Sequence, residues 1–132
     1  MTSRLGLALI AMLTVAGTAA AGPADVIGVT VTQEDGDRWR FAATVRHADH
    51  DPDHWADWWR VRMPDGRELG RRVLLHSHVD EQPFTRDEIV RIPANERTVV
   101  VEAHDKIHGL GGQAVTVDLS RPRGPGYTVK RR

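Results

Sequence analysis

Hydrophobic and polar residues alternate along most of this chain with a period of two residues, which is the periodicity of half-buried β-strands. The alternation is clearest in residues 38–46, where Trp39, Phe41, Ala43 and Val45 share one face. Periodicity typical of helices is absent after the first 21 residues. The pattern predicts seven strands, in residues 26–32, 38–46, 55–63, 69–75, 88–92, 97–103 and 113–119.

Turn sequences separate these segments and indicate the fold class. Asp35-Gly36-Asp37 and Pro64-Asp65-Gly66 are typical of tight turns, and Pro93 ends the fifth predicted strand. The polar residues 77–87 and the glycine-rich residues 105–112 are expected to form longer loops. Seven short strands with turns between them predict an all-β fold, a seven-stranded sandwich of the immunoglobulin or fibronectin type.

The two ends of the chain differ from the strand-rich part. Residues 1–21 carry one charge, Arg4, then an apolar run and an Ala-x-Ala cleavage sequence, which together predict an export signal. The apolar run is too short for a membrane-spanning helix, so we expect a periplasmic or secreted mature chain without a transmembrane segment. Residues 22–120 are assigned to the β-sandwich domain. Residues 121–132 are basic and rich in Pro and Gly, and they are expected to form a flexible tail.

Composition narrows the chemistry that the chain can perform. There are 18 basic and 18 acidic residues, so no global field favours binding to nucleic acid. There is no cysteine, which excludes thiolate catalysis, cysteine-based zinc sites and iron–sulfur clusters. After residue 21 the only serines are Ser77 and Ser120, and no nucleophile-elbow, phosphate-loop or dinucleotide motif occurs. Metal ligands must therefore come from His, Asp, Glu or the backbone.

The seven histidines fall into three short clusters along the chain. In a sandwich whose strands alternate in direction, the loops that follow the second, fourth and sixth strands share one end, and all three clusters map to these loops. We therefore expect a transition-metal site at this end, with the ion as the main binding partner. The candidate ligands, in order of preference, are His76 and His78, then His54, His104 and His108, then His50, His47 and Asp105.

The spacing of the ligands and their type restrict the metal. In an extended backbone, His76 and His78 place both imidazoles on one side of the chain. Imidazoles with one or two carboxylates suit zinc, copper or iron better than calcium or magnesium. The acidic run in residues 49–53 begins like a calcium-binding loop, but His54 replaces the required glycine and Arg60 replaces the required final acid. The three aspartates of this run are also explained as turn formers beside a proline.

Other functions stay open at this point. The histidine-bearing end could instead recognise a partner protein in a pH-dependent way, because imidazole changes its charge near neutrality. The chain would then be a non-enzymatic interaction module. Asp105 could orient a ligand histidine rather than bind the ion itself. If a metal is bound, an open coordination position would allow hydrolytic or redox chemistry and a closed one only binding, so the pattern does not decide whether the chain is an enzyme.

One stretch resembles the catalytic domain of superoxide reductases, the desulfoferrodoxin and neelaredoxin family. His54–Val61, with the sequence HWADWWRV, is similar to that family's HYIEWIEL segment, and an Asp-Gly turn follows in both. His47 stands near the family's earlier His-Pro-Met element, and His104–Gly109 resembles its closing Cys-Asn-x-His-Gly element. The resemblance implies an immunoglobulin-like sandwich that holds iron, with His47, His54 and His108 as ligands and redox activity. The family's cysteine ligand is missing here, and His104 or Asp105 lies nearest to its place.

Overall fold

The computed structural model describes residues 22–50 and 52–132, and this part of the chain is all-β. The predicted export signal in residues 1–21, together with Asp51, lies outside the described residues. The strands are β1 (Asp25–Asp35), β2 (Arg38–Arg46), β3 (Ala56–Arg62), β4 (Glu68–Val73), β5 (Phe84–Arg91), β6 (Thr98–Asp105), β7 (Gly109–Leu110), β8 (Val115–Asp118), β9 (Arg123–Gly124) and β10 (Tyr127–Lys130).

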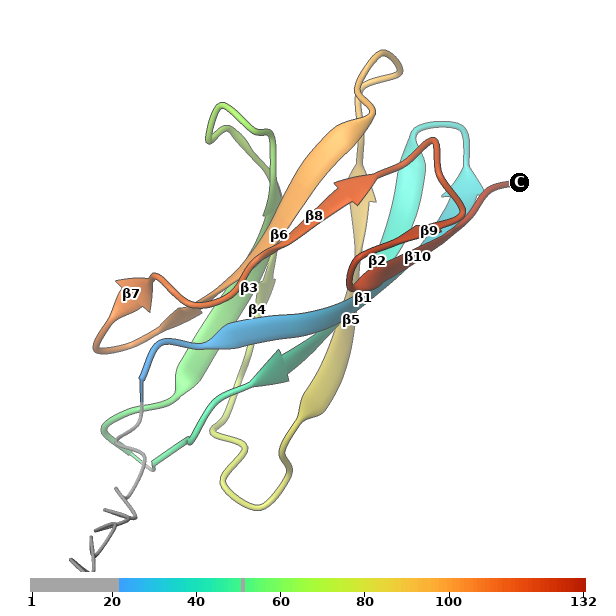
Figure 1. Cartoon of the computed structure of the whole chain (residues 1–132). Helices are drawn as coiled ribbons and strands as arrows, with labels where there is room; N and C mark the ends of the chain where they lie inside the picture. The colour runs from blue at the N-terminus through green and yellow to red at the C-terminus, as the bar shows by residue number, and fades with distance from the viewer. Residues whose placement is uncertain (1–21, 51) are drawn as a thin grey trace, which may run out of the picture.

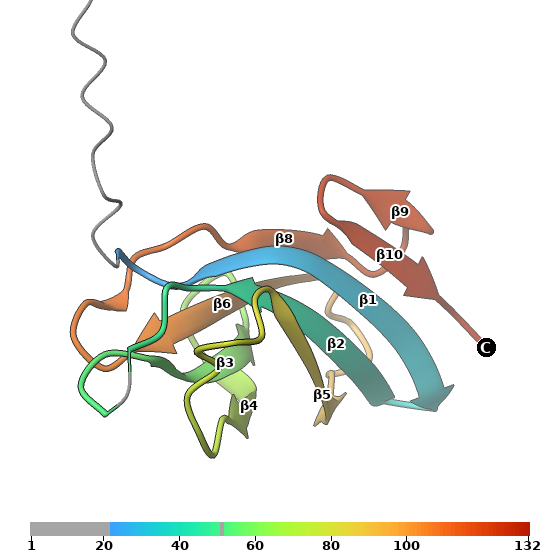
Figure 2. The same cartoon turned by 90° about the horizontal axis from the view of Figure 1, so that it is seen from below.

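The strands form two sheets that face each other as a sandwich (Figure 1). One sheet has the order β5-β2-β1-β10-β9. The other has the order β4-β3-β6-β7, and β8 pairs with β6 beyond this path. β1 and β10 run parallel, whereas the other paired strands are antiparallel. The view from below shows β10 and β9 extending the first sheet beyond β1 (Figure 2).

Local sequence explains why these segments form strands and turns. The alternating side chains of β2 are buried on one face and half-buried or exposed on the other, as the period of two requires. The turn between β3 and β4 is made by Pro64-Asp65-Gly66, in which Gly66 has φ of 100°, a conformation that costs glycine no Cβ clash. The Asp65 carboxylate accepts a hydrogen bond from the Arg67 amide at 3.0 Å, which closes this turn.

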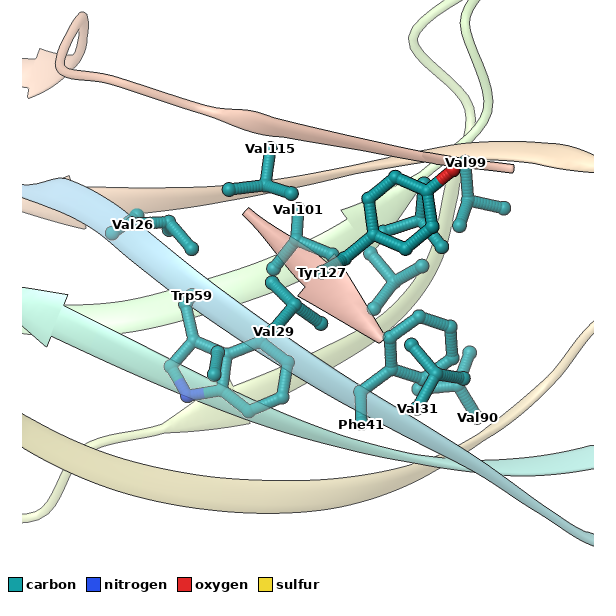
Figure 3. Close-up of a cluster of buried hydrophobic side chains, with 14 of the residues drawn as sticks. Val26, Val29, Val31, Phe41, Trp59, Val90, Val99, Val101, Val115 and Tyr127 are labelled. Carbon is teal, nitrogen blue, oxygen red and sulfur yellow. The ribbon is translucent and has the colours of Figure 1, made fainter. Parts of the chain in front are cut away.

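The core lies between the two sheets (Figure 3). Valine is its commonest residue, and large aromatic side chains, alanines and a few other aliphatic side chains complete it. Trp59 from β3 and Phe41 from β2 are fully buried. Burial of such side chains is the main favourable term in folding, at about 1.5–3 kcal/mol for each large apolar group. The core residues labelled in the close-up are Val26, Val29, Val31, Phe41, Trp59, Val90, Val99, Val101, Val115 and Tyr127.

One edge of the sandwich is closed by a glycine. A Cβ atom at Gly70 in β4 would lie 2.8 Å from a methyl group of Val90 in β5, so only glycine lets these strands of opposite sheets approach closely. The Arg72 guanidinium donates a hydrogen bond to the backbone oxygen of Asp87 at 2.8 Å and links the same two strands. The two layers are therefore tied together beside the β4–β5 connection.

The observed strands correct the predicted number. Seven of the strands, β1 to β6 and β8, coincide with the predicted segments, but ten are present in the described residues. β5 begins at Phe84, four residues earlier than residue 88, because Phe84 is buried and its segment pairs with β2. β7 lies within the predicted loop at residues 105–112.

The predicted tail is also corrected. Residues 121–132 contribute β9 and β10, and β10 pairs with β1 in a parallel register. Tyr127 and Val129 alternate with polar residues and are 7% and 8% exposed. Burial of these two side chains against the core outweighs the basic, glycine- and proline-rich composition that predicted a flexible segment.

The topology brings the histidine-bearing segments to one end of the sandwich. β2, β4 and β6 all finish there, so the loops formed by residues 47–50 with 52–55, by 74–83 and by 106–108 are neighbours at the lower left of the view (Figure 1). We call these three loops, with the last two residues of β6, the histidine end. The part of the chain that the structure describes has no helix with the length and apolarity needed to cross a membrane.

Candidate metal centre

Three segments of the histidine end supply the side chains of one compact cluster. His47 follows β2 directly, His54 precedes β3, and Asp105 is the last residue of β6. A backbone pairing holds His54 beside His50, and in it the two amides donate to each other's carbonyl oxygens. Asp105 is placed by the sheet itself, because it lies opposite Ala56 in the pairing of β3 with β6.

These three side chains point potential ligand atoms at a common point. One ligand atom from each of His47, His54 and Asp105 lies within 4.8 Å of the other two. His54 Nε2 is 3.2 Å from Asp105 Oδ1, and His47 Nε2 is 3.5 Å from Asp105 Oδ2. The two imidazole rings meet edge to face, with centroids 4.8 Å apart. Among residues 22–50 and 52–132 this is the group of histidines and carboxylates whose spacing could hold a metal ion.

Two of the facing atoms are buried without a hydrogen-bond partner in the described residues. His47 Nε2 and Asp105 Oδ2 both belong to side chains that are almost wholly inaccessible, with 1% and 0% exposure. Buried polar atoms are normally satisfied, since an unsatisfied one costs about 1–3 kcal/mol. When the His47 proton is on Nδ1, both atoms are acceptors directed at one point, and a bound cation would complete this arrangement.

Asp49 fixes the orientation of His47. Its carboxylate lies 2.5 Å from His47 Nδ1, and it also accepts hydrogen bonds from the backbone amides of Ala56 and His78. A carboxylate on one imidazole nitrogen holds the proton there and leaves the lone pair on the other nitrogen. His47 therefore presents Nε2 to the cluster. Burial opposes ionisation of Asp49, but His47 and the two amides lower the pKa of this carboxyl overall.

The charge state of the cluster follows from the same neighbours. Burial raises the pKa of Asp105, but the backbone amides of His108 and Ile107, with His54 and His47 nearby, outweigh burial and lower it. Asp105 is therefore a carboxylate at neutral pH. Burial also lowers the pKa of His47, but the hydrogen bond and charge of Asp49, then the charge of Asp105 and the nearby backbone of Gly22, raise it overall. The Gly22 backbone does not reach hydrogen-bonding geometry with the buried Nε2 atom.

His108 lies at the rim of the cluster. Its Nδ1 atom is 3.2 Å from His54 Nε2 and 3.3 Å from Asp105 Oδ2. Its side chain is 40% exposed, whereas that of His54 is 14% exposed. The cluster therefore has a closed side at His47 and a solvent-facing side at His108, where a fourth ligand would come from this histidine or from solvent.

His76 and His78, the first ligands proposed from the sequence, lie apart from this cluster. Their rings are 4.5 Å apart, but the described residues around them supply no third ligand at metal-binding distance. His78 is stacked on Phe84, and its Nε2 faces the Arg86 guanidinium at 3.2 Å, which disfavours a second cation. The loop that carries them is not an extended strand, so the spacing rule that favoured them does not apply.

His104 and His50 are also outside the cluster. Adjacent residues of a strand point to opposite faces, so Asp105 faces inward while His104 lies on the outer face of its sheet. There His104 Nδ1 is 2.6 Å from Asp57 Oδ1 and its ring stacks on Trp58. His50 is exposed and contributes its backbone to the pairing with His54.

The sequence undervalued or missed the residues that support the cluster. The sequence pattern explains Asp49 only as a turn former and gives no role to Gln82. In the structure the Gln82 side chain accepts a hydrogen bond from the His47 amide at 3.0 Å. Asp49 has a signal in the sequence, since it lies two residues after a histidine at the end of a strand. Gln82 has none, because its partner is 35 residues away and the pairing depends on how two loops pack.

Comparisons with known proteins place few constraints on this chain. No protein-family model matches it, and no solved structure matches it. A protein of Halomicrobium mukohataei described as "Putative lipoprotein" is 45% identical over 95 residues, which is 72% of this chain and 47% of that protein. The chain therefore spans about half the length of this curated relative.

Proposed function

We propose that this protein binds one transition-metal ion through His47, His54 and Asp105. The observation that carries the proposal is the pair of buried, unsatisfied atoms, His47 Nε2 and Asp105 Oδ2, which face each other beside His54. Asp49 supplies the carboxylate that a ligand histidine commonly has on its second nitrogen. Burial of these polar side chains without partners is unfavourable for folding, and a bound ion would satisfy them. The site is therefore preformed for a cation.

The donor set selects the class of ion. Two imidazoles and one carboxylate suit zinc, copper or iron, and this combination with open positions is the arrangement of non-haem iron(II) sites. Calcium and magnesium prefer sets made of oxygen alone. When bound, such an ion would act as a Lewis acid or a redox centre towards a ligand that enters from the His108 side.

A second proposal is redox chemistry in an architecture shared with superoxide reductases. The residues that the resemblance implies as ligands, His47, His54 and His108, are the histidines that lie around Asp105. Asp105 is also one of the two residues nearest to the place of the missing cysteine. The order of the seven predicted strands, β5-β2-β1 facing β4-β3-β6-β8, supports an immunoglobulin- or fibronectin-like sandwich.

We also propose that the protein is exported and acts in the periplasm, at the cell envelope or outside the cell. The apolar run after Arg4 and the name of the curated relative support this location.

Elemental analysis of protein purified without a histidine tag tests the proposal. We expect close to one zinc, copper or iron ion per chain in the wild type. His54→Ala and Asp105→Ala should remove it, whereas His76→Ala and His104→Ala should keep it. Absence of metal in the wild type, with no uptake of added Zn²⁺, Cu²⁺ or Fe²⁺, would show that the cluster is not a metal site. Folding that then depended on pH alone would favour the interaction module.

A further inference from the structure

The loop between β4 and β5 is joined to the candidate metal centre by a closed ring of hydrogen bonds. His47 Nδ1 lies 2.5 Å from Asp49 Oδ1, and Asp49 Oδ2 accepts a hydrogen bond from the His78 amide at 2.7 Å. The His78 carbonyl accepts one from Gln82 Nε2 at 3.0 Å, and Gln82 Oε1 accepts one from the His47 amide at 3.0 Å. The ring thus begins and ends at His47.

The ring holds His47 at two points. The Asp49 side fixes the imidazole, and the Gln82 side fixes the backbone that carries it. The orientation of the Gln82 amide is set by its partners, because an N–H requires the oxygen and a carbonyl requires the nitrogen. Each of the four residues therefore makes two of the contacts that close the ring.

We propose that loop 74–83 regulates the metal centre, with Gln82 as a positioning residue that sets the affinity for the ion through His47. This inference rests on the proposed metal site. Gln82 contacts the backbone of His47 and none of the potential ligand atoms of the cluster, so it acts on how well the site is preformed. Because coupling between two equilibria is reciprocal, the ion should stabilise the ring by the same factor that the ring adds to its affinity.

The position of His76 and His78 gains an explanation from this ring. Their loop is a support for the site, and the backbone of His78 takes part through its amide and its carbonyl. The His78 imidazole is stacked on Phe84 and buried, which keeps this part of the loop in one place. His76 and His78, which the sequence favoured as ligands, therefore affect ion binding indirectly, through the loop that supports His47.

The test compares Co²⁺ binding in the wild type, Gln82→Ala and Gln33→Ala. Gln33 is a matched control, because its side chain also bridges two backbone groups, the Gly36 carbonyl and the Arg132 amide, at the other end of β1. We expect Gln82→Ala to weaken Co²⁺ binding by about tenfold, the usual size of such supporting contacts, and Gln33→Ala to bind as the wild type does. Gln82→Glu keeps the acceptor for the His47 amide and loses the donor to His78, so its affinity should fall between the two.

Two further measurements distinguish a role of Gln82 in positioning His47 from a general loss of stability. Melting curves in chelator should be nearly the same for Gln82→Ala and Gln33→Ala. Hydrogen exchange of the His47 and His78 amides should slow when Co²⁺ is added to the wild type and to Gln33→Ala, and much less in Gln82→Ala. Asp49→Asn offers one oxygen to three donors and should also weaken binding, whereas Asp57→Asn, in the corresponding pair with His104, should not.

The outcomes distinguish the role of Gln82 from the existence of the metal site. Wild-type protein that binds Co²⁺ while Gln82→Ala binds it equally well would overturn the regulatory role and leave the metal site standing. If addition of Co²⁺ to the wild type left the hydrogen-exchange rate of the His78 amide unchanged, the regulatory role would also be overturned and the metal site would stand. Wild-type protein that binds no Co²⁺ would overturn the metal site and, with it, the role of the ring.

Discussion

The neighbours of an imidazole decide what it can do, and His47 and His104 show this within one molecule. Each has a carboxylate on Nδ1, from Asp49 and Asp57 respectively. His47 is buried, and its second nitrogen faces Asp105, whereas His104 lies on the outer face of its sheet, stacked on Trp58. The same pair of side chains is therefore part of a candidate metal centre in one place and of a surface stack in the other.

The burial of His78 makes folding stability depend on pH. Burial lowers the pKa of His78, and the nearby charges of His76 and Arg86 lower it further, against smaller opposite effects of Asp49 and Glu81. Below a pH of about 6.5 the unfolded chain therefore takes up a proton that the folded chain refuses, so the free energy of unfolding falls as the pH falls. Above that pH both states are neutral at this residue, and the effect vanishes.

The measurement is denaturant unfolding of the wild type and His78→Phe in chelator between pH 5 and pH 8. His78→Phe keeps the stacking partner for Phe84 and the backbone amide that Asp49 accepts, and it removes the titrating group. We expect the wild type to lose stability relative to the variant by about 1.4 kcal/mol for each pH unit in which only its unfolded chain is protonated. A constant difference between the two proteins from pH 5 to pH 8 would contradict this.

The alternation of apolar and polar residues predicts which residues belong to the core. The spacing of the histidines, in contrast, favours His76 and His78 as ligands over His47 and Asp105, which the structure brings together. Trp39, Phe41 and Val45 are buried as their alternation predicts, because strand periodicity alone decides which face they occupy. Ligand choice depends on contacts between loops far apart in the sequence. His47 and Asp105 are 58 residues apart in the printed numbering, and no local rule brings them together.

At the scale of elements, a bulge and an added strand shape the molecule. The register of β3 with β6 shifts between Ala56 and Trp58, and the extra residue, Asp57, is aimed at His104. The alternation between faces then resumes with Trp59 in the core. Sequence pattern located β3 to within a residue at each end, but a bulge leaves no such mark, because it is set by the pairing partner.

The strand β10 should contribute to stability, contrary to what its composition indicates. Tyr127 is buried against the core, whereas Thr128 beside it is exposed. Tyr127→Ala should lower the free energy of unfolding by about 3–5 kcal/mol, the cost of truncating a large buried aromatic side chain. Thr128→Ala, on the same strand, should change it by less than about 0.5 kcal/mol. Urea unfolding of the two variants measures this, and a neutral Tyr127→Ala would mean that residues 121–132 are the flexible tail that composition suggests.

At the scale of the whole molecule, the candidate centre joins segments that the fold holds together only at the histidine end. His47 and His54 belong to the connection between the two sheets, and Asp105 ends a strand of the second sheet. An ion bound to all three would therefore cross-link the layers where they are joined by loops. It would bind the folded chain far better than the unfolded one, because the unfolded chain does not preform the site.

Binding to the folded state alone raises stability by mass action, so the melting temperature should rise with the concentration of free ion. At 100 times the dissociation constant the gain is about 2.7 kcal/mol, or roughly 10 °C for a domain of this size. The melting temperature, measured at increasing free Zn²⁺, should keep rising with the logarithm of the Zn²⁺ concentration after the site is full. His54→Ala should flatten this dependence and His104→Ala should keep it, since only the former removes a ligand of the cluster. If the melting temperature rose equally in both variants and as much as in the wild type, the ion would bind outside the cluster. The same result would exclude the pair of His104 and Asp57 on the outer face as the binding site.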